Sequence, residues 1–288
     1  MTLYLGIDAG GTSCRARLTD EAGKVLGLGQ AGPANTRIGL EALRATLLEA
    51  TSKASAAAGL TEEEVAALKV GMGIAGINRA GIKPQIQALQ FPFASLALSS
   101  DAVIANLGAH AGGDGAILIL GTGSVGLIKR GEDSTSIGGY GFPISDEGSG
   151  AALGLSAIRH ALRALDGRTR PTPLSRELTQ NFEHAIPQII SWMDDAAPGD
   201  FARFAPLVLN HAESGDEIAL SIVRDAALHV ERFIETIFAR GGTRCVLMGG
   251  LAEPMKPWLR ARIVDRLVAP LGDALDGALL LAGRPALL

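Results

Sequence analysis

The sequence of 288 residues contains few cysteines, few aromatic side chains and no long apolar run. Its two cysteines, Cys14 and Cys245, are too few for a disulfide framework or a four-thiolate zinc site, so we expect both to be reduced, buried thiols. No stretch reaches the ~18 apolar residues of a membrane-spanning helix, and the N-terminus lacks the basic region and cleavage site of a signal peptide. We therefore expect a cytoplasmic protein with no membrane partner.

An excess of basic charge is also absent. Lysine and arginine number 26 against 30 aspartate and glutamate residues, which gives a net charge of −4. A nucleic-acid partner bound by a basic face is therefore not expected. Hydrophobic residues make up 47% and charged residues 19% of the chain, which excludes global disorder. Glycine, by contrast, is abundant at 37 residues, and its placement is informative.

The predicted elements fall into two α/β halves, and each half opens with a strand, a glycine-rich turn and a second strand. A cluster of glycines at 108–115 marks the boundary, and the shared opening makes internal duplication a hypothesis. Capping boxes are predicted at Thr61 with Glu64 and at Ser214 with Glu217. The expected strands are 3–7, 14–19, 25–29, 69–74, 95–99, 115–120, 125–129 and 243–248, and the expected helices are 40–57, 80–90, 102–110, 151–165, 174–183, 187–194 and 215–240.

The first glycine turn, Asp8-Ala9-Gly10-Gly11-Thr12-Ser13, lies between two predicted strands. Two adjacent residues without Cβ atoms let backbone N–H groups approach an anion closely. Asp8 at the strand end can orient a hydrated divalent cation, and the Thr12 and Ser13 hydroxyls can donate hydrogen bonds. The same residues also fit an ordinary hairpin turn.

The second turn, Gly121-Thr122-Gly123-Ser124, repeats this chemistry in the second half. It too could be a simple turn, but two such hairpins, one in each half, suit two opposed cradles for the phosphates of one nucleotide. Neither is a Walker A loop, because no Gly-Lys-Ser/Thr follows, and neither is a Rossmann fingerprint, because no helix begins at the glycines.

Three further segments carry polar residues at strand ends or in loops. Asp101 follows the strand 95–99, where it could accept a proton from a substrate hydroxyl or merely cap the helix 102–110. The loop Gly138-Gly139-Tyr140-Gly141 leads to Asp146 and Glu147, which could accept hydrogen bonds from a sugar or cap the next helix. Gly249-Gly250-Leu251 ends the last strand and permits close approach of a base or ribose. The five histidines form no pair at i, i+4 or closer, so we expect them on helix surfaces and expect no metal beyond Mg²⁺.

In this order, Asp8–Thr12, Asp101, Gly121–Ser124 and Met248–Gly250 resemble the phosphate-1, connecting, phosphate-2 and adenosine segments of the sugar kinase/heat-shock/actin superfamily. More closely, Gly139–Gly141 with Ser145–Gly150 resembles the N-acetylglucosamine kinase family, within the BadF-type ATPases. The resemblance covers about residues 3–283. It departs from the family at Val125, Tyr140 and Ser145, where members often have Asn, Trp and Gly, and this leaves the sugar open.

The resemblance implies an α/β fold of two ribonuclease-H-like, actin-like ATPase domains with ATP and sugar in the cleft between them. The first domain would comprise 1–110 with 276–288 packing back on it, and the second 111–275. It implies Asp101 as catalytic base and Asp8 as organiser of Mg²⁺, which it would hold through water. ATP would be held by Gly10, Gly11, Thr12, Ser13, Gly121, Thr122, Gly123, Ser124, Gly249, Gly250 and Leu251, and the sugar by Asn35, Asp101, Gly139, Tyr140, Gly141 and Asp146.

The function so implied is ATP-dependent phosphorylation of the 6-hydroxyl of N-acetylglucosamine or glucosamine, by a homodimer. One alternative is an ATP-hydrolysing activator of a radical dehydratase, which has the same fold but holds a [4Fe–4S] cluster between subunits through two cysteines per chain. A second alternative is a non-catalytic sugar sensor. A sensor would be expected to lose Asp101 or one phosphate hairpin, and this chain keeps both.

Overall fold

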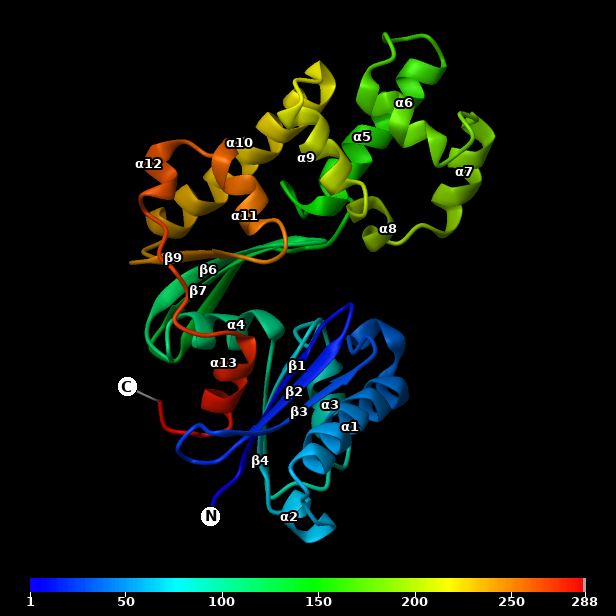
Figure 1. Cartoon of the computed structure of the whole chain (residues 1–288). Helices are drawn as coiled ribbons and strands as arrows, with labels where there is room; N and C mark the ends of the chain where they lie inside the picture. The colour runs from blue at the N-terminus through cyan, green and yellow to red at the C-terminus, as the bar shows by residue number, and fades with distance from the viewer. Residues whose placement is uncertain (287–288) are drawn as a thin grey trace. The chain divides into compact units, whose positions relative to one another are not determined.

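The computed structural model describes residues 1–286, and it confirms the α/β class with two separate sheets (Figure 1). The chain divides into two compact units. Unit 1 comprises Met1–Gly115, the short segment Lys129–Ser134 and the C-terminal segment from Ala269; unit 2 comprises Ala116–Ile128 and Thr135–Val268. Within the described residues, no helix combines the length and apolarity that crossing a membrane requires.

Unit 1 is built on a five-stranded sheet of order β3-β2-β1-β4-β5. β1 pairs antiparallel with β2 and parallel with β4, and β4 pairs parallel with β5. The carboxyl ends of β1, β4 and β5 therefore share one edge of the sheet. The elements of unit 1 are β1 (Tyr4–Ala9), β2 (Cys14–Thr19), β3 (Val25–Ala31), the 3₁₀ helix η1 (Thr36–Ile38), α1 (Leu40–Ala57), α2 (Glu62–Ala66), β4 (Lys69–Ile74), α3 (Ile82–Gln87), β5 (Ser95–Ser99), α4 (Asp101–Ala109) and α13 (Ala274–Leu281).

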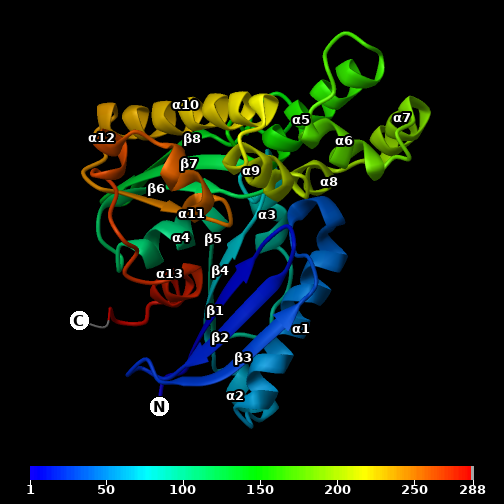
Figure 2. The ribbon, with the colours of Figure 1, turned by 45° about the horizontal axis from the view of Figure 1, so that its top comes forward.

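The helices of unit 1 bury the apolar faces of this sheet. α1 presents Leu43, Leu47, Ala50 and Ala54 at helical spacing and packs on β2 and β3, while α13 packs on α4, β1 and β4 (Figures 1 and 2). The central strand β1 is almost wholly buried, as expected for a strand covered on both faces. Helices on both faces of the sheet hold its strand ends in fixed positions.

Unit 2 has a four-stranded sheet of order β8-β7-β6-β9, in which β6 and β9 are parallel, and a core of its own. The long helix α10 lies along this sheet (Figure 2). Ile237 of α10 lies near Gly126 of β7, and Phe233 lies near Gly138 of β8. The elements that lie wholly or mostly in unit 2 are β6 (Gly115–Leu120), β7 (Ser124–Arg130), β8 (Asp133–Gly138), α5 (Gly150–Leu165), α6 (Pro173–Gln180), α7 (Ile186–Asp195), α8 (Pro198–Ala202), α9 (Ala205–Glu213), α10 (Glu217–Ala239), β9 (Cys245–Met248), α11 (Ala252–Met255), η2 (Lys256–Trp258) and α12 (Ala261–Val264).

The start of α10 differs from the sequence-based expectation. The predicted capping box at Ser214 and Glu217 is wrong: Asp216 caps α10, accepting bonds from the Ile218 and Ala219 N–H groups at 3.0 Å. The Ser214 hydroxyl instead donates to the Asn210 carbonyl, at the end of α9. Asp216 wins because its second carboxylate oxygen also accepts the Leu174 N–H, at 2.9 Å, which ties α10 to α6.

Other differences concern elements without a clear apolar period. β8 was not expected, because its sequence Asp-Ser-Thr-Ser-Ile-Gly is polar and mostly exposed, as suits an edge strand. α8 and α9 were not expected either. The prediction that every histidine lies on a helix surface is wrong for His110, which is only 3% exposed after α4.

Candidate functional site

The carboxyl edge of the unit 1 sheet brings together two carboxylates. Asp8 is the penultimate residue of β1, and Asp101 follows β5 as the first residue of α4. Asp101 is not the helix cap: the Ser100 hydroxyl accepts the Val103 N–H at 3.2 Å, while Asp101 accepts the N–H of Ala102 at 2.9 Å. The capping role that could have explained Asp101 therefore belongs to its neighbour.

Burial is the main cause that raises the pKa of Asp101, and the negative charge of Asp8 raises it further. The two carboxylates are thus electrostatically coupled within one unit. A carboxyl with a raised pKa is a better proton acceptor than an ordinary aspartate once it is ionised, which suits a general base.

The first glycine turn lies beside these carboxylates and holds Asn35 close. The Gly10 carbonyl accepts the Ala34 N–H at 2.9 Å, and Asn35 forms a parallel bridge to Ala75, just after β4. A Cβ atom added at Gly11 would have only the Asn35 amide nitrogen within 4 Å, at 3.9 Å. The space over Gly11 is therefore open, as a phosphate cradle requires.

The side chains around this turn differ in how many of their hydrogen-bonding groups already have a partner. The Thr12 and Ser13 hydroxyls make no hydrogen bond to any described residue, so their donors are available. The Asn35 side-chain oxygen accepts the Arg37 N–H at 2.9 Å, which leaves its amide N–H groups to donate. Arg15, which the sequence reasoning did not single out, donates to Asp8 at 2.6 Å.

The second glycine turn, in unit 2, is held by hydrogen bonds to the start of α5 and to the preceding loop. The N–H groups of Gly150 and Ala151, at the start of α5, donate to the carbonyls of Gly121 and Thr122 at 2.8 and 3.1 Å. The Ser124 hydroxyl donates to the Glu147 carbonyl at 2.8 Å. The turn is therefore held in place by the loop that carries Asp146 and Glu147.

Asp146 lies directly on this second turn. A Cβ atom added at Gly123 would come within 2.9 Å of the Asp146 carboxylate, and the backbone N–H groups of Ser124, Phe142 and Gly141 donate to that carboxylate. Burial nevertheless raises the pKa of Asp146, because it outweighs these hydrogen bonds. Asp146 is thus already bonded to the backbone, in addition to the sugar-binding role expected of it.

The predicted adenosine segment meets the same edge of the unit 2 sheet. β6 and β9 are parallel, and the Leu251 N–H donates to the Leu120 carbonyl at 3.1 Å, immediately before the second turn. Gly249 has a φ of +98°, a conformation that favours glycine. Gly249, Gly250 and Leu251 are thereby placed next to Gly121.

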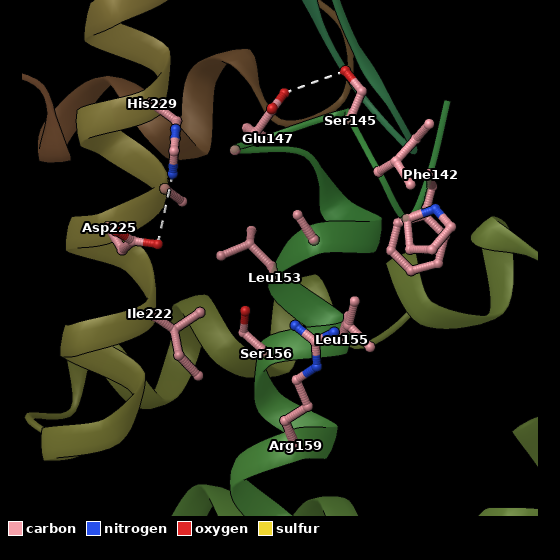
Figure 3. Close-up of a pocket in the computed structure, with 15 residues that line it drawn as sticks. Phe142, Ser145, Glu147, Leu153, Leu155, Ser156, Arg159, Ile222, Asp225 and His229 are labelled. Atoms are coloured by element: carbon pink, nitrogen blue, oxygen red, sulfur yellow. Dashed lines mark hydrogen bonds and ion pairs between the residues drawn. The ribbon is translucent and has the colours of Figure 1, made fainter. Parts of the chain in front are cut away.

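The loop that follows β8 presents different residues in different directions. Tyr140 is 76% exposed and its neighbour Gly139 packs against Val125. Glu147 faces a pocket of about 220 Å³ between α5 and α10, whose walls include Ser156, Arg159 and His229 (Figure 3). Asp146 does not line this pocket. The two adjacent acidic side chains therefore lie in different places, Asp146 at the second glycine turn and Glu147 at the pocket.

The donor set suits magnesium rather than a metal bound by the protein alone. Among residues 1–286, no group of three or more His, Cys, Asp or Glu side chains could hold a metal ion. Mg²⁺ keeps several waters and uses one or two carboxylates together with substrate phosphates. A strand-end Asp8 beside an open turn fits that mode of binding.

Both cysteines are confirmed as buried, unpaired thiols. Burial is the main cause that raises the pKa of each thiol to about 12, so neither supplies a thiolate at neutral pH. Cys14 lies in β2 and Cys245 in β9, each with no exposed surface. The cysteines therefore play no part in the candidate site.

Comparison with known proteins gives consistent findings. The family model described as the BadF/BadG/BcrA/BcrD ATPase family matches residues 5–282. The glucosamine kinase GspK of Vibrio cholerae serotype O1 is 38% identical over 285 residues, which cover 99% of this chain and 97% of that protein. The N-acetyl-D-glucosamine kinase of Dictyostelium discoideum is 27% identical over 83% of this chain and 80% of its own. A crystal structure from Chromobacterium violaceum, assigned to the N-acetylglucosamine kinases, superposes with a TM-score of 0.92 at 33% identity, over 98% of this chain and 99% of that one.

Proposed function

Since this chain belongs to the BadF/BadG/BcrA/BcrD ATPase family, we propose that it is an ATP-dependent kinase that phosphorylates the 6-hydroxyl of an amino sugar, glucosamine or N-acetylglucosamine. The observation that carries the proposal is the pair Asp8 and Asp101 at the ends of parallel strands, beside an open glycine turn. Full-length similarity to kinases of these two sugars supports the acceptor class.

Asp101 is the proposed base. Its carboxylate accepts the proton of the sugar hydroxyl, whose oxygen forms the new bond to the γ-phosphorus while the bond to the β–γ bridging oxygen breaks and ADP leaves. Phosphoryl transfer depends mainly on positioning and electrostatic stabilisation, so the protein needs few reactive groups. The raised pKa of Asp101 favours proton uptake at this point.

The nucleotide is divided between the two units in this proposal. Unit 1 offers the N–H group of Gly11 and the free hydroxyls of Thr12 and Ser13, while the Gly10 N–H donates to the Ser13 carbonyl at 3.0 Å and closes the turn. Unit 2 offers the turn Gly121–Ser124 and the segment Gly249–Leu251. When bound, Mg²⁺ would neutralise phosphate charge, and Asp8 would hold it through water. No other residue of the chain is assigned to the metal.

The sugar is assigned to Asn35 in unit 1 and to Asp146, with Gly139, Tyr140 and Gly141, in unit 2. Asn35 keeps its amide N–H groups free to donate to a hydroxyl oxygen. The carboxylate of Asp146 accepts backbone N–H groups and would also accept a hydrogen bond from a sugar hydroxyl. The exposed ring of Tyr140 offers a flat face to the sugar. These assignments, the homodimer and the cytoplasmic location stay predictions.

The radical dehydratase activator is disfavoured by the cysteines. A [4Fe–4S] cluster needs thiolate ligands, whereas both thiols here are fully buried with pKa values raised to about 12. A sugar sensor is disfavoured because both glycine turns and Asp101 are formed and Asp101 has no capping role.

A coupled assay for ADP release tests the proposal. Purified protein with Mg²⁺ and ATP is given glucosamine, N-acetylglucosamine, N-acetylmannosamine, glucose or no sugar. ADP release that depends on glucosamine or N-acetylglucosamine is expected. Equal ADP release with and without sugar would instead indicate an ATPase, and no ATP turnover with any sugar would favour a sensor.

A further inference from the structure

A pocket of about 220 Å³ in unit 2 has no role in the proposed reaction. None of the residues assigned to ATP, Mg²⁺ or the sugar lines it. Figure 3 shows the pocket between α5, which supplies Leu153, Ser156 and Arg159, and α10, which supplies Ile222. Pockets for drug-sized ligands have volumes of roughly 300–1,000 Å³, so this one suits a smaller metabolite rather than a nucleotide.

Two opposite charges line this pocket without a charged partner. The Arg159 guanidinium makes no hydrogen bond or ion pair to any described residue. Among the same residues, the Glu147 carboxylate accepts only the Ser145 hydroxyl, at 3.3 Å. Figure 3 shows Glu147 and Arg159 apart, with Leu153 between them in this view. A ligand with an anionic group at one end and a cationic group at the other would satisfy both side chains.

The rest of the lining suits a sugar ring between these two charges. Ser156 lies three residues before Arg159 on α5, so the two side chains share one helix face and can bind the same phosphate group. Leu153 and Ile222 are buried and offer apolar surface to the C–H groups of a ring. A 2-amino sugar 6-phosphate carries its ammonium and phosphate groups at opposite ends of such a ring. It therefore matches the charges, the hydroxyl and the apolar surface of the pocket.

The pocket shares a loop with the second glycine turn. The Glu147 carbonyl accepts the Ser124 hydroxyl at 2.8 Å, and the Asp146 carboxylate accepts the Ser124 and Phe142 N–H groups. Phe142 and Glu147 both line the pocket. An ammonium group at Glu147 would compete with the Ser145 hydroxyl for the carboxylate and disturb the carbonyl that holds Ser124. Occupation of the pocket should therefore weaken ATP binding at the second turn, and ATP should weaken occupation by the same factor.

We propose that this pocket is a second binding site, for a phosphorylated amino sugar, through which the reaction product lowers the affinity for ATP. Arg159 and Ser156 bind the phosphate, and Glu147 binds the ammonium group. A guanidinium binds phosphate through paired N–H donors, which gives the site its preference for this anion. The regulatory part of the proposal rests on the proposed function, whereas the binding site itself does not.

Calorimetry with glucosamine 6-phosphate tests the site, in excess N-acetylglucosamine, which carries no charge and fills the proposed sugar site. Arg159→Gln should weaken binding roughly tenfold to hundredfold, because a charged hydrogen bond is lost. Glu147→Gln should weaken binding of glucosamine 6-phosphate but not of glucose 6-phosphate, which has no ammonium group. Arg224→Gln is the matched control, because Arg224 is another exposed arginine, on α10 outside the pocket. It should leave both affinities unchanged.

The regulatory effect is measured as the apparent Kd for ATP at increasing glucosamine 6-phosphate. This Kd should rise at least about fivefold in wild type, within the usual range of coupling between two sites, and should stay constant in Arg159→Gln. An equal rise in both proteins, or no rise in wild type, would overturn the regulatory role. Equal affinity of wild type for inorganic phosphate and glucosamine 6-phosphate would overturn the amino-sugar assignment, because the site would then bind anions in general.

Failure of this inference can be told apart from failure of the proposed function. An active amino-sugar kinase whose affinity for glucosamine 6-phosphate does not depend on Arg159 would contradict this inference alone. A protein that binds glucosamine 6-phosphate through Arg159 but phosphorylates no sugar would contradict the proposed function and support the binding site.

Discussion

The two glycine turns have similar sequences but different surroundings. The turn at Gly10 and Gly11 in unit 1 is open above Gly11 and has charged neighbours, Asp8 and Arg15. The turn at Gly121–Ser124 in unit 2 is held from behind by the start of α5 and by the loop that carries Asp146, through neutral backbone donors and one carboxylate. The same sequence motif therefore has two environments.

This difference suggests a division of labour. A charged, open edge suits the metal, the transferred phosphate and the proton acceptor, because these need groups that change partners during the reaction. A turn fastened at several backbone positions suits holding the nucleotide in a fixed place. Substitution of the unit 1 carboxylates should therefore lower turnover, whereas substitutions in the second turn should lower ATP binding and stability together.

The largest effect is expected from the base. Asp101→Asn should lower kcat by roughly 10²–10⁴-fold, the usual contribution of general acid–base catalysis, while sugar affinity changes little. Steady-state kinetics and sugar titration measure the two quantities separately. Asp20→Asn, in the β2–β3 turn of the same unit, is a suitable control. Near-normal turnover of Asp101→Asn would remove Asp101 from the mechanism.

Valine at the two glycine turns should separate binding from stability. Gly11→Val and Gly123→Val should both block ATP binding, because side-chain carbons would take the space of the phosphates. Only Gly123→Val should also lower the thermal unfolding temperature, because its Cβ would press on Asp146 at 2.9 Å whereas Gly11 has open space. ATP calorimetry and thermal unfolding of both variants measure this. Equal stabilities would contradict the contrast between the turns.

The two proposed sugar contacts should also respond differently. Asn35→Ala should raise the apparent KM for the sugar by roughly tenfold, with little change in the KM for ATP. Asp146→Ala should raise both constants, because the carboxylate also holds the Ser124 backbone of the second turn. Steady-state kinetics with both substrates varied show whether each residue affects the KM for the sugar alone or the KM values for both substrates. Unchanged sugar dependence in both variants would show that the sugar site is misplaced.

The raised pKa of Asp101 predicts a pH-dependent cost in stability. A carboxyl whose pKa is higher in the folded than in the unfolded state destabilises the fold when it is ionised, above that raised pKa. The cost is absent below the pKa of the unfolded state, at about 3.9. Asp101→Asn should therefore raise the unfolding temperature at pH 7 and leave it nearly unchanged near pH 3. An equal shift at both pH values would rule out burial of charge as the cause.

The smallest effect is expected at Tyr140. This side chain is 76% exposed in its loop, and we expect it to act through its ring face rather than its hydroxyl. Tyr140→Phe should change the sugar KM by less than about threefold, whereas Tyr140→Ala should change it more. A large loss in the phenylalanine variant would instead assign a hydrogen bond to the hydroxyl.

The sequence predicted the features that depend on local patterns. The regular apolar spacing of α1 and the capping box of Thr61 and Glu64 are confirmed, and the strands at both glycine turns were correctly expected. The sequence could not predict which of two residues caps α10. Asp216 caps it in place of Ser214, and Asp216 also accepts the N–H of Leu174, 42 residues away. The polar edge strand β8 lacks the alternation that marks a strand.

The candidate site shows the same limit. Asp8, Asn35 and Asp101 were named from motifs and resemblance, and the structure gathers them at one edge of unit 1. Arg15 was missed because it is an ordinary residue in the alternating pattern of β2. The β1–β2 register places Arg15 opposite Asp8. The short turn between the two strands is the one sequence signal that could have suggested this contact. The backbone bonds of Asp146 likewise depend on a loop that no pattern specifies.

Identification of the phosphorylated product by ³¹P and ¹³C NMR tests the central claim most directly. Wild-type protein with Mg²⁺ and ATP is incubated with glucosamine and, separately, with N-acetylglucosamine, and Asp101→Asn is treated in parallel. We expect a phosphate ester on carbon 6 of at least one sugar with wild type, and almost none in the same time with Asp101→Asn. A phosphate on another carbon, or inorganic phosphate released without any sugar ester, would contradict the account.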